Sequence, residues 1–197
     1  AARERLPHVF LSLSEAMSHV LAEALLRGDV DMAIAYDVPD VPQVDRVALL
    51  DEELVFVTLP VAGAAATVPF GEAIEESLIL PEQGDTVRDH VARAAHAIGV
   101  APKVAFEVRS IPAMKSLILR GAGSGILPYG AVLPEVREGR LFARRIVAPA
   151  LRRTLYVAVR SSRTPLRNEV ALRAVIRDSL SGLLETLGPL AHPLAAG

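Results

Sequence analysis

Short apolar runs alternate with segments of helical periodicity along this chain, and that alternation restricts it to the α/β fold class. Residues 30–36 form a nearly continuous apolar run, which is typical of a buried parallel strand. They follow a helix expected over residues 15–27, with Ser14 as its N-cap and Gly28 as its stop. A further strand is expected over residues 8–13. The sequence thus predicts an α/β protein with largely parallel sheets.

The alternation continues through the middle of the chain. After a loop over residues 60–71, rich in Ala, Gly and Pro, the expected strands are 77–80, 103–108 and 126–127. The helices between them are expected over residues 86–98, capped by Asp85, and from Ser110 onward through Met114, Leu117 and Ile118. The chain then returns through residues 141–146 and a strand over 154–159, and it closes with a helix from Pro165 to Leu187 that Gly188 and Pro189 end.

Residues 44–59 are expected to form one extended segment, long enough to leave one sheet and enter another. We therefore expect two Rossmann-like lobes joined by two crossover strands, near Thr58 and near Arg153. Lobe I comprises residues 1–58 and 154–187, lobe II comprises residues 59–153, and residues 188–197 form a tail. A double connection makes a hinge, and small ligands commonly bind in a cleft between two lobes.

Composition excludes several classes of function. The chain has no cysteine, so it has neither disulfides nor thiolate metal sites nor a cysteine nucleophile. A net charge of −2 and an aromatic content of 4% give no footprint for nucleic acid. No apolar run reaches the roughly 18 residues of a membrane span, and the N-terminus lacks a secretory signal. A cytoplasmic location is favoured.

The remaining motifs favour structural roles over chemistry. The glycine-rich run over residues 121–125 follows a helix and opens a strand, the reverse of a nucleotide-binding loop, so it predicts a turn. The five histidines lack metal-ligand spacing, and neither a metal nor another cofactor is expected. The acidic run Asp51, Glu52, Glu53 is interpreted as a solvated turn. The basic pairs, Arg144 with Arg145 and Arg152 with Arg153, are interpreted as surface or interlobe contacts.

Two helix starts carry small polar residues where a βα loop would face the cleft. The first is Gly84, Asp85 and Thr86, and the second is Ser110 and Ile111. Helix N-termini expose unpaired N–H groups and bind carboxylates or other acceptors. Simple capping is the alternative, because Asp, Ser and Thr serve that purpose anyway. Two such starts aimed at one cleft favour binding.

Residues 23–34, EALLRGDVDMAI, combine a helix end, a Gly, an Asp and a small apolar strand, and residues 113–128 end in RGAGSGILP. The first run resembles a signature of the effector domain of LysR-type transcription regulators, and the second resembles the V-x-x-G-x-G-I-x-x-L-P segment of the same family. Glu52, Leu54, Val55 and Val57 resemble the family's crossing strand. Together the resemblance covers about residues 7–185.

The resemblance implies a fold similar to type 2 periplasmic binding proteins, with a small-molecule effector held between lobes and no catalytic residues. It implies assembly as a homodimer or homotetramer, with DNA bound by an N-terminal winged helix-turn-helix absent from this chain. The effector contacts carried over are Ser18, Tyr36, Gly84, Asp85, Thr86, Ser110 and Ile111. The chain begins inside the family's first helix, so either the protein is longer and its first lobe I strand precedes Ala1, or the first lobe is incomplete. We expect the longer protein. The alternative is a solute-binding protein of a transport system, which shares the architecture.

Overall fold

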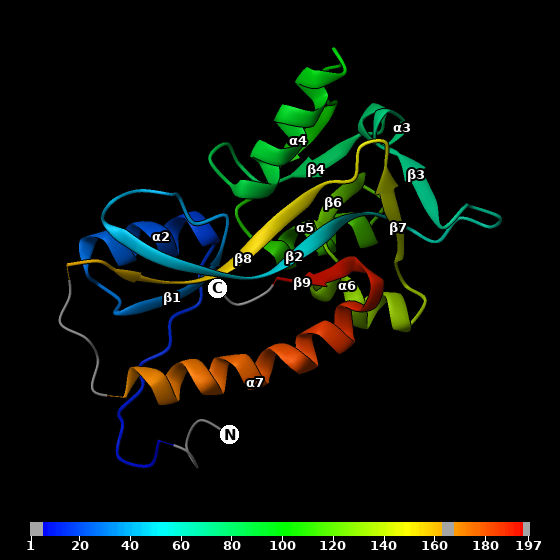
Figure 1. Cartoon of the computed structure of the whole chain (residues 1–197). Coiled ribbons are helices and arrows are strands. Elements are labelled where there is room, and N and C mark those ends of the chain that lie inside the picture. The colour runs from blue at the N-terminus through cyan, green and yellow to red at the C-terminus, as the bar shows by residue number, and fades with distance from the viewer. Residues whose placement is uncertain (1–5, 163–167, 195–197) are drawn as a thin grey trace. The chain divides into compact units, whose positions relative to one another are not determined.

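The computed structural model describes residues 6–162 and 168–194, and the chain divides into two compact units (Figure 1). Unit 1 comprises Ala1–Leu50 and Leu155–Gly197, and unit 2 comprises Asp51–Thr154. Strands β2 (Val44–Thr58) and β8 (Arg152–Arg160) contribute residues to both units.

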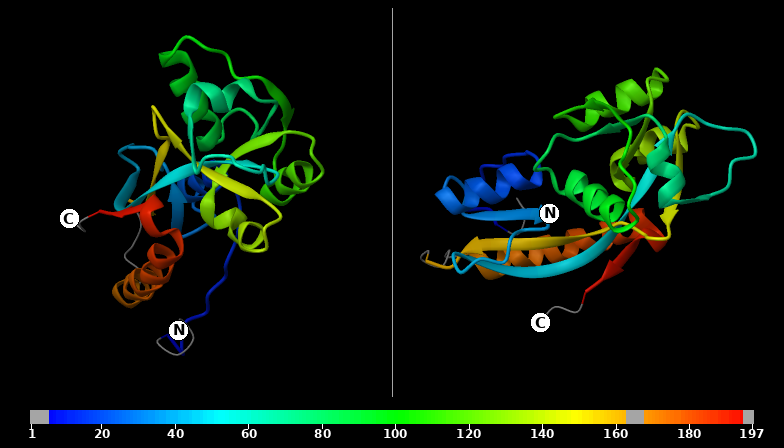
Figure 2. Two further views of the ribbon diagram at one scale, coloured as in Figure 1. Left: turned by 90° about the vertical axis from the view of Figure 1, so that its right-hand side faces the viewer. Right: turned by 90° about the horizontal axis from the view of Figure 1, so that it is seen from above.

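The sheet of unit 1 has the order β1-β8-β2, with β9 (Ala191–Pro193) also paired to β2. Strand β1 (Met32–Tyr36) is antiparallel to β8. Helix α2 (Ser18–Arg27) packs on β1. Helix α7 (Glu169–Leu187), which continues into the short 3-10 helix Gly188–Leu190, lies on the other side of this sheet (Figures 1 and 2). The sheet of unit 1 is therefore covered on both faces.

Side-chain alternation along the strands divides the core of unit 1 into two faces. Ala33, Ala35 and Ala158 pack with Leu25 of α2. Because successive side chains of a strand point to opposite faces, the neighbouring buried residues Leu155, Val157 and Val159 point away from α2. The small alanines on the first face let the helix approach the sheet closely.

Helix α2 ends as the sequence predicts. Gly28 adopts the left-handed conformation at φ 83°, and the N–H groups of Gly28 and Asp29 donate to Leu25 O and Ala24 O. These two bonds form a Schellman motif, which favours glycine because φ is positive. The helix begins at Ser18, with Met17 rather than Ser14 at its N-cap.

The strand expected over residues 8–13 is not formed, so that prediction is wrong. These residues lie in irregular structure, with Phe10 and Leu13 about nine-tenths exposed. An apolar run forms a strand only where a neighbouring strand and a packed face receive it, and this segment has no strand pairing.

The sheet of unit 2 has the order β3-β7-β2-β6-β4-β5. The strands other than β2 are β3 (Thr67–Pro69), β4 (Leu78–Leu80), β5 (Val104–Glu107), β6 (Ser124–Pro128) and β7 (Phe142–Val147). The helices are α3 (Phe70–Glu75), α4 (Thr86–Ala97), α5 (Ile111–Leu119) and α6 (Tyr129–Arg137). Strand β4 is parallel to β5 and β6, whereas β2 is antiparallel to β6 and β7. The sheet therefore contains more antiparallel pairing than expected. The reason is that β2 enters the sheet as a crossover strand and is not part of a βαβ unit, whose strands are parallel.

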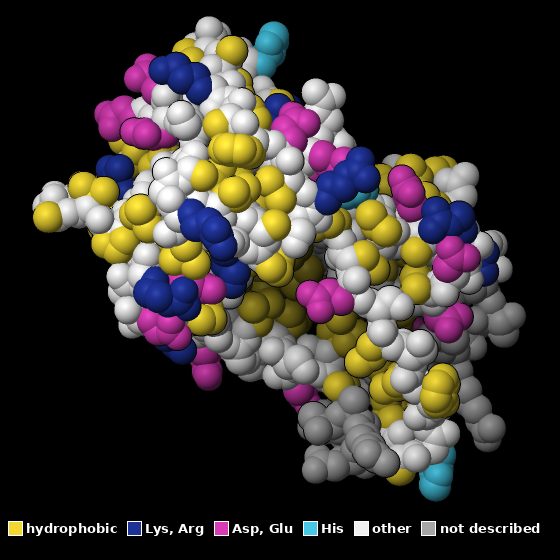
Figure 3. Space-filling model, turned by 180° about the vertical axis from the view of Figure 1, so that it is seen from behind, with side chains coloured by type: hydrophobic (Ala, Val, Ile, Leu, Met, Phe, Trp, Pro, Cys, Tyr) yellow, Lys and Arg dark blue, Asp and Glu magenta, His cyan; other side chains and the backbone are white. Residues whose placement is uncertain are grey.

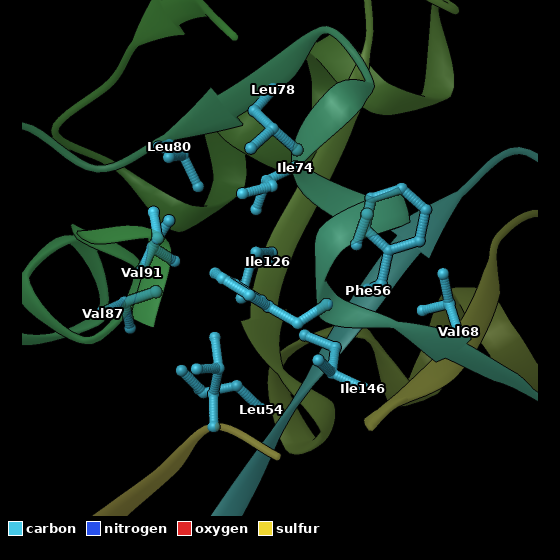
Figure 4. Packing of buried hydrophobic residues seen from close by; sticks show 14 residues of the cluster. Leu54, Phe56, Val68, Ile74, Leu78, Leu80, Val87, Val91, Ile126 and Ile146 are labelled. Atoms are coloured by element: carbon cyan, nitrogen blue, oxygen red, sulfur yellow. The ribbon is translucent and has the colours of Figure 1, made fainter. Parts of the chain in front are cut away.

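The largest core cluster lies between the unit 2 sheet and the helices α3 and α4 (Figure 4). Leu54, Phe56 and Ile126 of the sheet meet Ile74 of α3 and Val91 of α4 there. The alternate residues Val55 and Val57 point to the other face of β2, and Ile118 of α5 lies over Gly125 of β6. Helices therefore cover both faces of this sheet as well.

Five elements of the described residues were not expected from the sequence: β3, α3, α6, the 3-10 helix Gly188–Leu190 and β9. The first two lie partly in the predicted loop over residues 60–71, whose Gly and Pro content suggested irregular structure. Helix α6 follows Pro128 and holds Pro134 in its interior. In the sequence, both prolines indicate positions where a helix would be interrupted. The long helix was expected from Pro165, which lies outside the described residues; its end at Gly188 is as expected.

The surface carries both signs of charge. In Figure 3, Lys and Arg side chains lie interspersed with Asp and Glu over the face shown, in accord with the net charge of −2. Among the described residues, no helix is long and apolar enough to cross a membrane. The same residues contain no group of three or more His, Asp or Glu that could hold a metal ion.

Candidate functional site

The two helix starts singled out in the sequence lie at one edge of the unit 2 sheet. Strands β4 and β5 are parallel neighbours, with Leu80 opposite Glu107 at their carboxyl ends. Helix α4 begins after the first of these ends and α5 after the second. Because parallel strands end at the same sheet edge, the segments Gly84–Thr86 and Ser110–Ile111 follow adjacent strand ends. An ion pair between Arg109 Nε and Glu82 Oε2, at 2.7 Å, joins the two loops.

Asp85 caps α4, as predicted. Its Oδ1 accepts from the Val87 N–H at 2.9 Å, and the residue is only 3% exposed. Gly84, before it, has φ 88° and open space around its Cα, while Thr86 is half-buried. The carboxylate of Asp85 is therefore committed to the helix, which leaves Gly84 and Thr86 as the more accessible members of this segment.

Ser110 occupies the same position on α5 but does not cap it with its side chain. Its carbonyl accepts from the Met114 N–H at 3.0 Å, whereas its exposed hydroxyl has no hydrogen-bond partner among the described residues. The N–H groups of Ile111 and Ala113 in the first helical turn have no intrahelical acceptor, and Pro112 between them has no N–H. The start of α5 therefore combines an open hydroxyl with the partial positive charge of a helix N-terminus.

Ser18 and Tyr36, the two candidates in unit 1, are brought together. The backbone N–H of Tyr36 donates to Ser18 Oγ at 3.1 Å, in a half-buried environment. This bond ties the start of α2 to the end of β1. The Ser18 hydroxyl keeps its own proton to donate, so the pair presents a positioned hydroxyl group.

The acidic run in β2 is buried, so its interpretation as a solvated turn is wrong. Glu52 and Glu53 are each 1% exposed. Glu53 is bound by two arginines: Arg145 Nη2 lies 2.9 Å and Arg152 Nη2 lies 3.0 Å from its Oε1. Arg153 Nη2 donates to Glu52 Oε2 at 2.7 Å. These contacts lie within unit 2 and join β2 to β7 and β8.

This ion-pair cluster was missed in the sequence, although a signal for it was present. Three acidic residues in one expected strand face two arginine pairs in the returning segments, and a buried carboxylate needs such partners. Hydrogen bonds to Glu53 and the charge of that carboxylate raise the pKa of Arg145 above its ordinary value. The fourth arginine, Arg144, donates instead to the carbonyls of Ala65 and Thr67. The cluster is therefore structural.

The fold matches those of solved regulatory domains. The effector-binding domain of QuiR, in complex with shikimate, superposes with a TM-score of 0.78 at 19% identity, over 91% of this chain and 85% of that one. At this identity the likeness shows the fold, a mixed α/β architecture similar to type 2 periplasmic binding proteins. This confirms the expected fold class.

Comparison of sequences identifies the family. The profile described as "LysR substrate binding domain" matches residues 1–181. The HTH-type transcriptional regulator BbuR of Bordetella bronchiseptica is 25% identical over 98% of this chain, and the nitrogen assimilation regulatory protein nac of Klebsiella aerogenes is 30% identical over 90%. The chain belongs to the LysR substrate-binding domain family: it is the effector-binding domain of a LysR-type transcription regulator. The relatives are regulators rather than enzymes, as expected.

The chain spans about 60% of the length of both curated relatives. The match therefore concerns the regulatory part of those proteins.

Proposed function

We propose that this domain senses a small molecule through the adjacent starts of α4 and α5, with Gly84, Thr86, Ser110 and Ile111 as contacts and Asp85 as the cap that holds the loop. The observation that carries the proposal is the open hydroxyl of Ser110 beside the N-terminus of α5. A ligand acceptor, such as a carboxylate or hydroxyl oxygen, would satisfy both groups. The solved QuiR domain, which has shikimate bound, supports a small-molecule ligand on this fold.

In unit 1, Ser18 and Tyr36 are proposed as further effector contacts. Their hydrogen bond fixes the Ser18 side chain, so little rotamer entropy would be lost when its hydroxyl donates to a ligand.

We further propose that the whole regulator binds DNA through a winged helix-turn-helix outside this chain, acts in the cytoplasm and assembles as a homodimer or homotetramer. The relatives support this role, since the chain spans about 60% of their length. The net charge of −2 supports it too, because DNA binding needs a basic surface. Effector binding would then shift the balance between assembly states for which the ligand has different affinities.

The test begins with a thermal-shift screen of small organic acids, amino acids and aromatic compounds on the 197-residue chain. A compound that binds the native state raises the unfolding midpoint as its concentration exceeds Kd. Calorimetry then measures Kd for Ser110→Ala, Thr86→Ala and Ser18→Ala. We expect Kd to rise about tenfold in each variant, because each substitution removes one hydrogen bond to the ligand.

Ser116→Ala is the matched control, since Ser116 is exposed on the same helix, away from its start. It should bind with the Kd of the unchanged chain. Hits whose affinity survives both Ser110→Ala and Thr86→Ala would place the effector elsewhere and overturn the proposed site.

A further inference from the structure

An open cavity of about 730 Å³ lies at the surface of unit 2, among residues other than those of the two helix starts described above. One wall is formed by His90, Arg93 and Ala94 of α4, and the other by residues 149–152, the segment that enters β8. Neither Thr86 nor Ser110 lines it. Its volume falls within the range of about 300–1,000 Å³ that small-molecule sites occupy.

The ionisable side chains that line this cavity are all of basic residue types. Arg93, Arg152 and His90 line it, and no lining residue carries a carboxylate. Arg93 contacts the His90 ring at 3.1 Å and has no carboxylate partner among the described residues. Its guanidinium therefore has N–H groups left to bind an anion.

Arg152 also has binding capacity to spare. Its Nε and Nη2 both donate to Oε1 of Glu53, which leaves Nη1 for another acceptor. Glu53 is shared with Arg145, so two guanidinium groups surround one carboxylate. Two arginines therefore share one carboxylate beside the cavity, and Nη1 of Arg152 is the group left to bind an anion.

The rest of the lining is apolar. Leu151 is buried, while Ala94, Pro149 and Ala150 add further apolar surface. Apolar walls with a few placed charges are typical of sites for small organic ligands, because burial supplies affinity and the charges fix orientation. Inorganic anions would leave these walls without a partner.

We infer that this cavity is a second ligand site, specific for a small carboxylate with an apolar body, such as an aromatic acid. The carboxylate binds between Arg93 and Nη1 of Arg152, and the apolar body lies against Leu151 and Pro149. Because Arg152 also holds Glu53 of β2, an occupant of the cavity contacts the same arginine that joins β8 to β2. A ligand bound in the cavity therefore contacts a member of the ion-pair cluster directly.

The test uses the 197-residue chain and benzoate as the probe, followed by backbone amide NMR and calorimetry. Saturable shifts are expected at the amides of His90, Arg93, Ala94, Leu151 and Arg152. Benzamide, which has the same shape without the charge, and acetate, which has the charge without the ring, should each bind at least about tenfold more weakly.

The variant Arg93→Gln should weaken benzoate binding about tenfold, while Arg137→Gln, which removes an exposed arginine of α6, should leave it unchanged. Ser110→Ala should also leave these shifts unchanged, so failure of the second site is distinguishable from failure of the proposed effector site. The inference is overturned if benzoate causes no saturable shifts at these amides, if Arg93→Gln leaves Kd unaltered, or if benzamide binds equally well.

Discussion

Arg153 and Glu52 form an ion pair that is closed to water: the Nη2–Oε2 distance is 2.7 Å, and the two side chains are 10% and 2% exposed. The pair joins β8 to β2 at the point where both strands enter unit 2. Removing one partner of such a pair leaves an uncompensated charge in a medium of low dielectric constant.

We expect Arg153→Ala to lower the free energy of unfolding by about 3–5 kcal/mol. The double variant Glu52→Leu/Arg153→Met should recover most of this loss, since it removes both charges and keeps the volume. Urea unfolding followed by circular dichroism measures both values. Arg109→Ala, whose pair with Glu82 is 83% exposed on the arginine side, is the control and should cost at most about 1 kcal/mol.

The two helix starts of unit 2 should respond differently to alanine. Asp85→Ala removes a side-chain cap and should cost about 1 kcal/mol in unfolding free energy. Ser110→Ala removes no capping bond, so the unfolding free energy should change by no more than about 0.5 kcal/mol. Equal losses in the two variants would show that Ser110 caps α5 in solution.

Gly123 and Gly182 should respond to alanine with opposite signs. A Cβ at Gly123 would overlap the Ser77 carbonyl oxygen, and only a shift of the backbone could relieve this contact. Gly123→Ala should therefore cost about 3 kcal/mol. Gly182 lies in α7 with nothing within 4 Å, so Gly182→Ala should stabilise the chain by about 0.5–1 kcal/mol. Thermal unfolding of the two variants decides the signs.

The pair of Lys115 and Glu135, at 2.8 Å between α5 and α6, should make stability depend on pH. Burial opposes ionisation of Glu135, but hydrogen bonds from Lys115 and the backbone, with the charges of Lys115 and Arg140, leave the pKa of Glu135 below its ordinary value. A carboxyl whose folded pKa is depressed contributes stability above its unfolded pKa of about 4.5, and loses it as pH falls through the folded value.

We therefore expect Lys115→Met to destabilise the chain at neutral pH, and the gap between the two proteins to shrink as pH falls below about 4.5. Chemical unfolding at a series of pH values measures that gap. Lys103→Met, which changes an exposed lysine, should show no such pH dependence. A gap that stays constant into acid would contradict the role assigned to Lys115.

Much of the fold could be predicted because the helix caps, helix ends and apolar spacing in the sequence agree with the packing that the folded chain requires. Gly28 ends α2, Asp85 caps α4, and the apolar spacing of Val87 and Val91 predicted the buried face of that helix. Strand β2 was expected over residues 44–59 and covers Val44–Thr58. In these places a single residue type has one favourable structural role.

The failures occur where partners distant in sequence decide the outcome. Glu52 and Glu53 are buried because arginines about a hundred residues later bind them. The acidic run and the two arginine pairs are visible in the sequence, but neither one alone indicates that they meet. Conversely, residues 8–13 have the composition of a strand without the pairing that would make them one. At the candidate site, Ser110 and Asp85 are equivalent by sequence, and only the structure distinguishes the capping side chain from the open one.

Strand β2 sets a limit on how sequences of this kind can diverge. Within unit 2 its residues alternate between two packed faces, Leu54 and Phe56 toward α3 and α4, Val55 and Val57 toward the opposite face. One inserted or deleted residue would exchange the two sets along the rest of the strand and would displace Glu53 from its arginines. Among homologous sequences, insertions and deletions should therefore be rare within β2. They should be tolerated in the turn before β3, where Gly63 has open space around it.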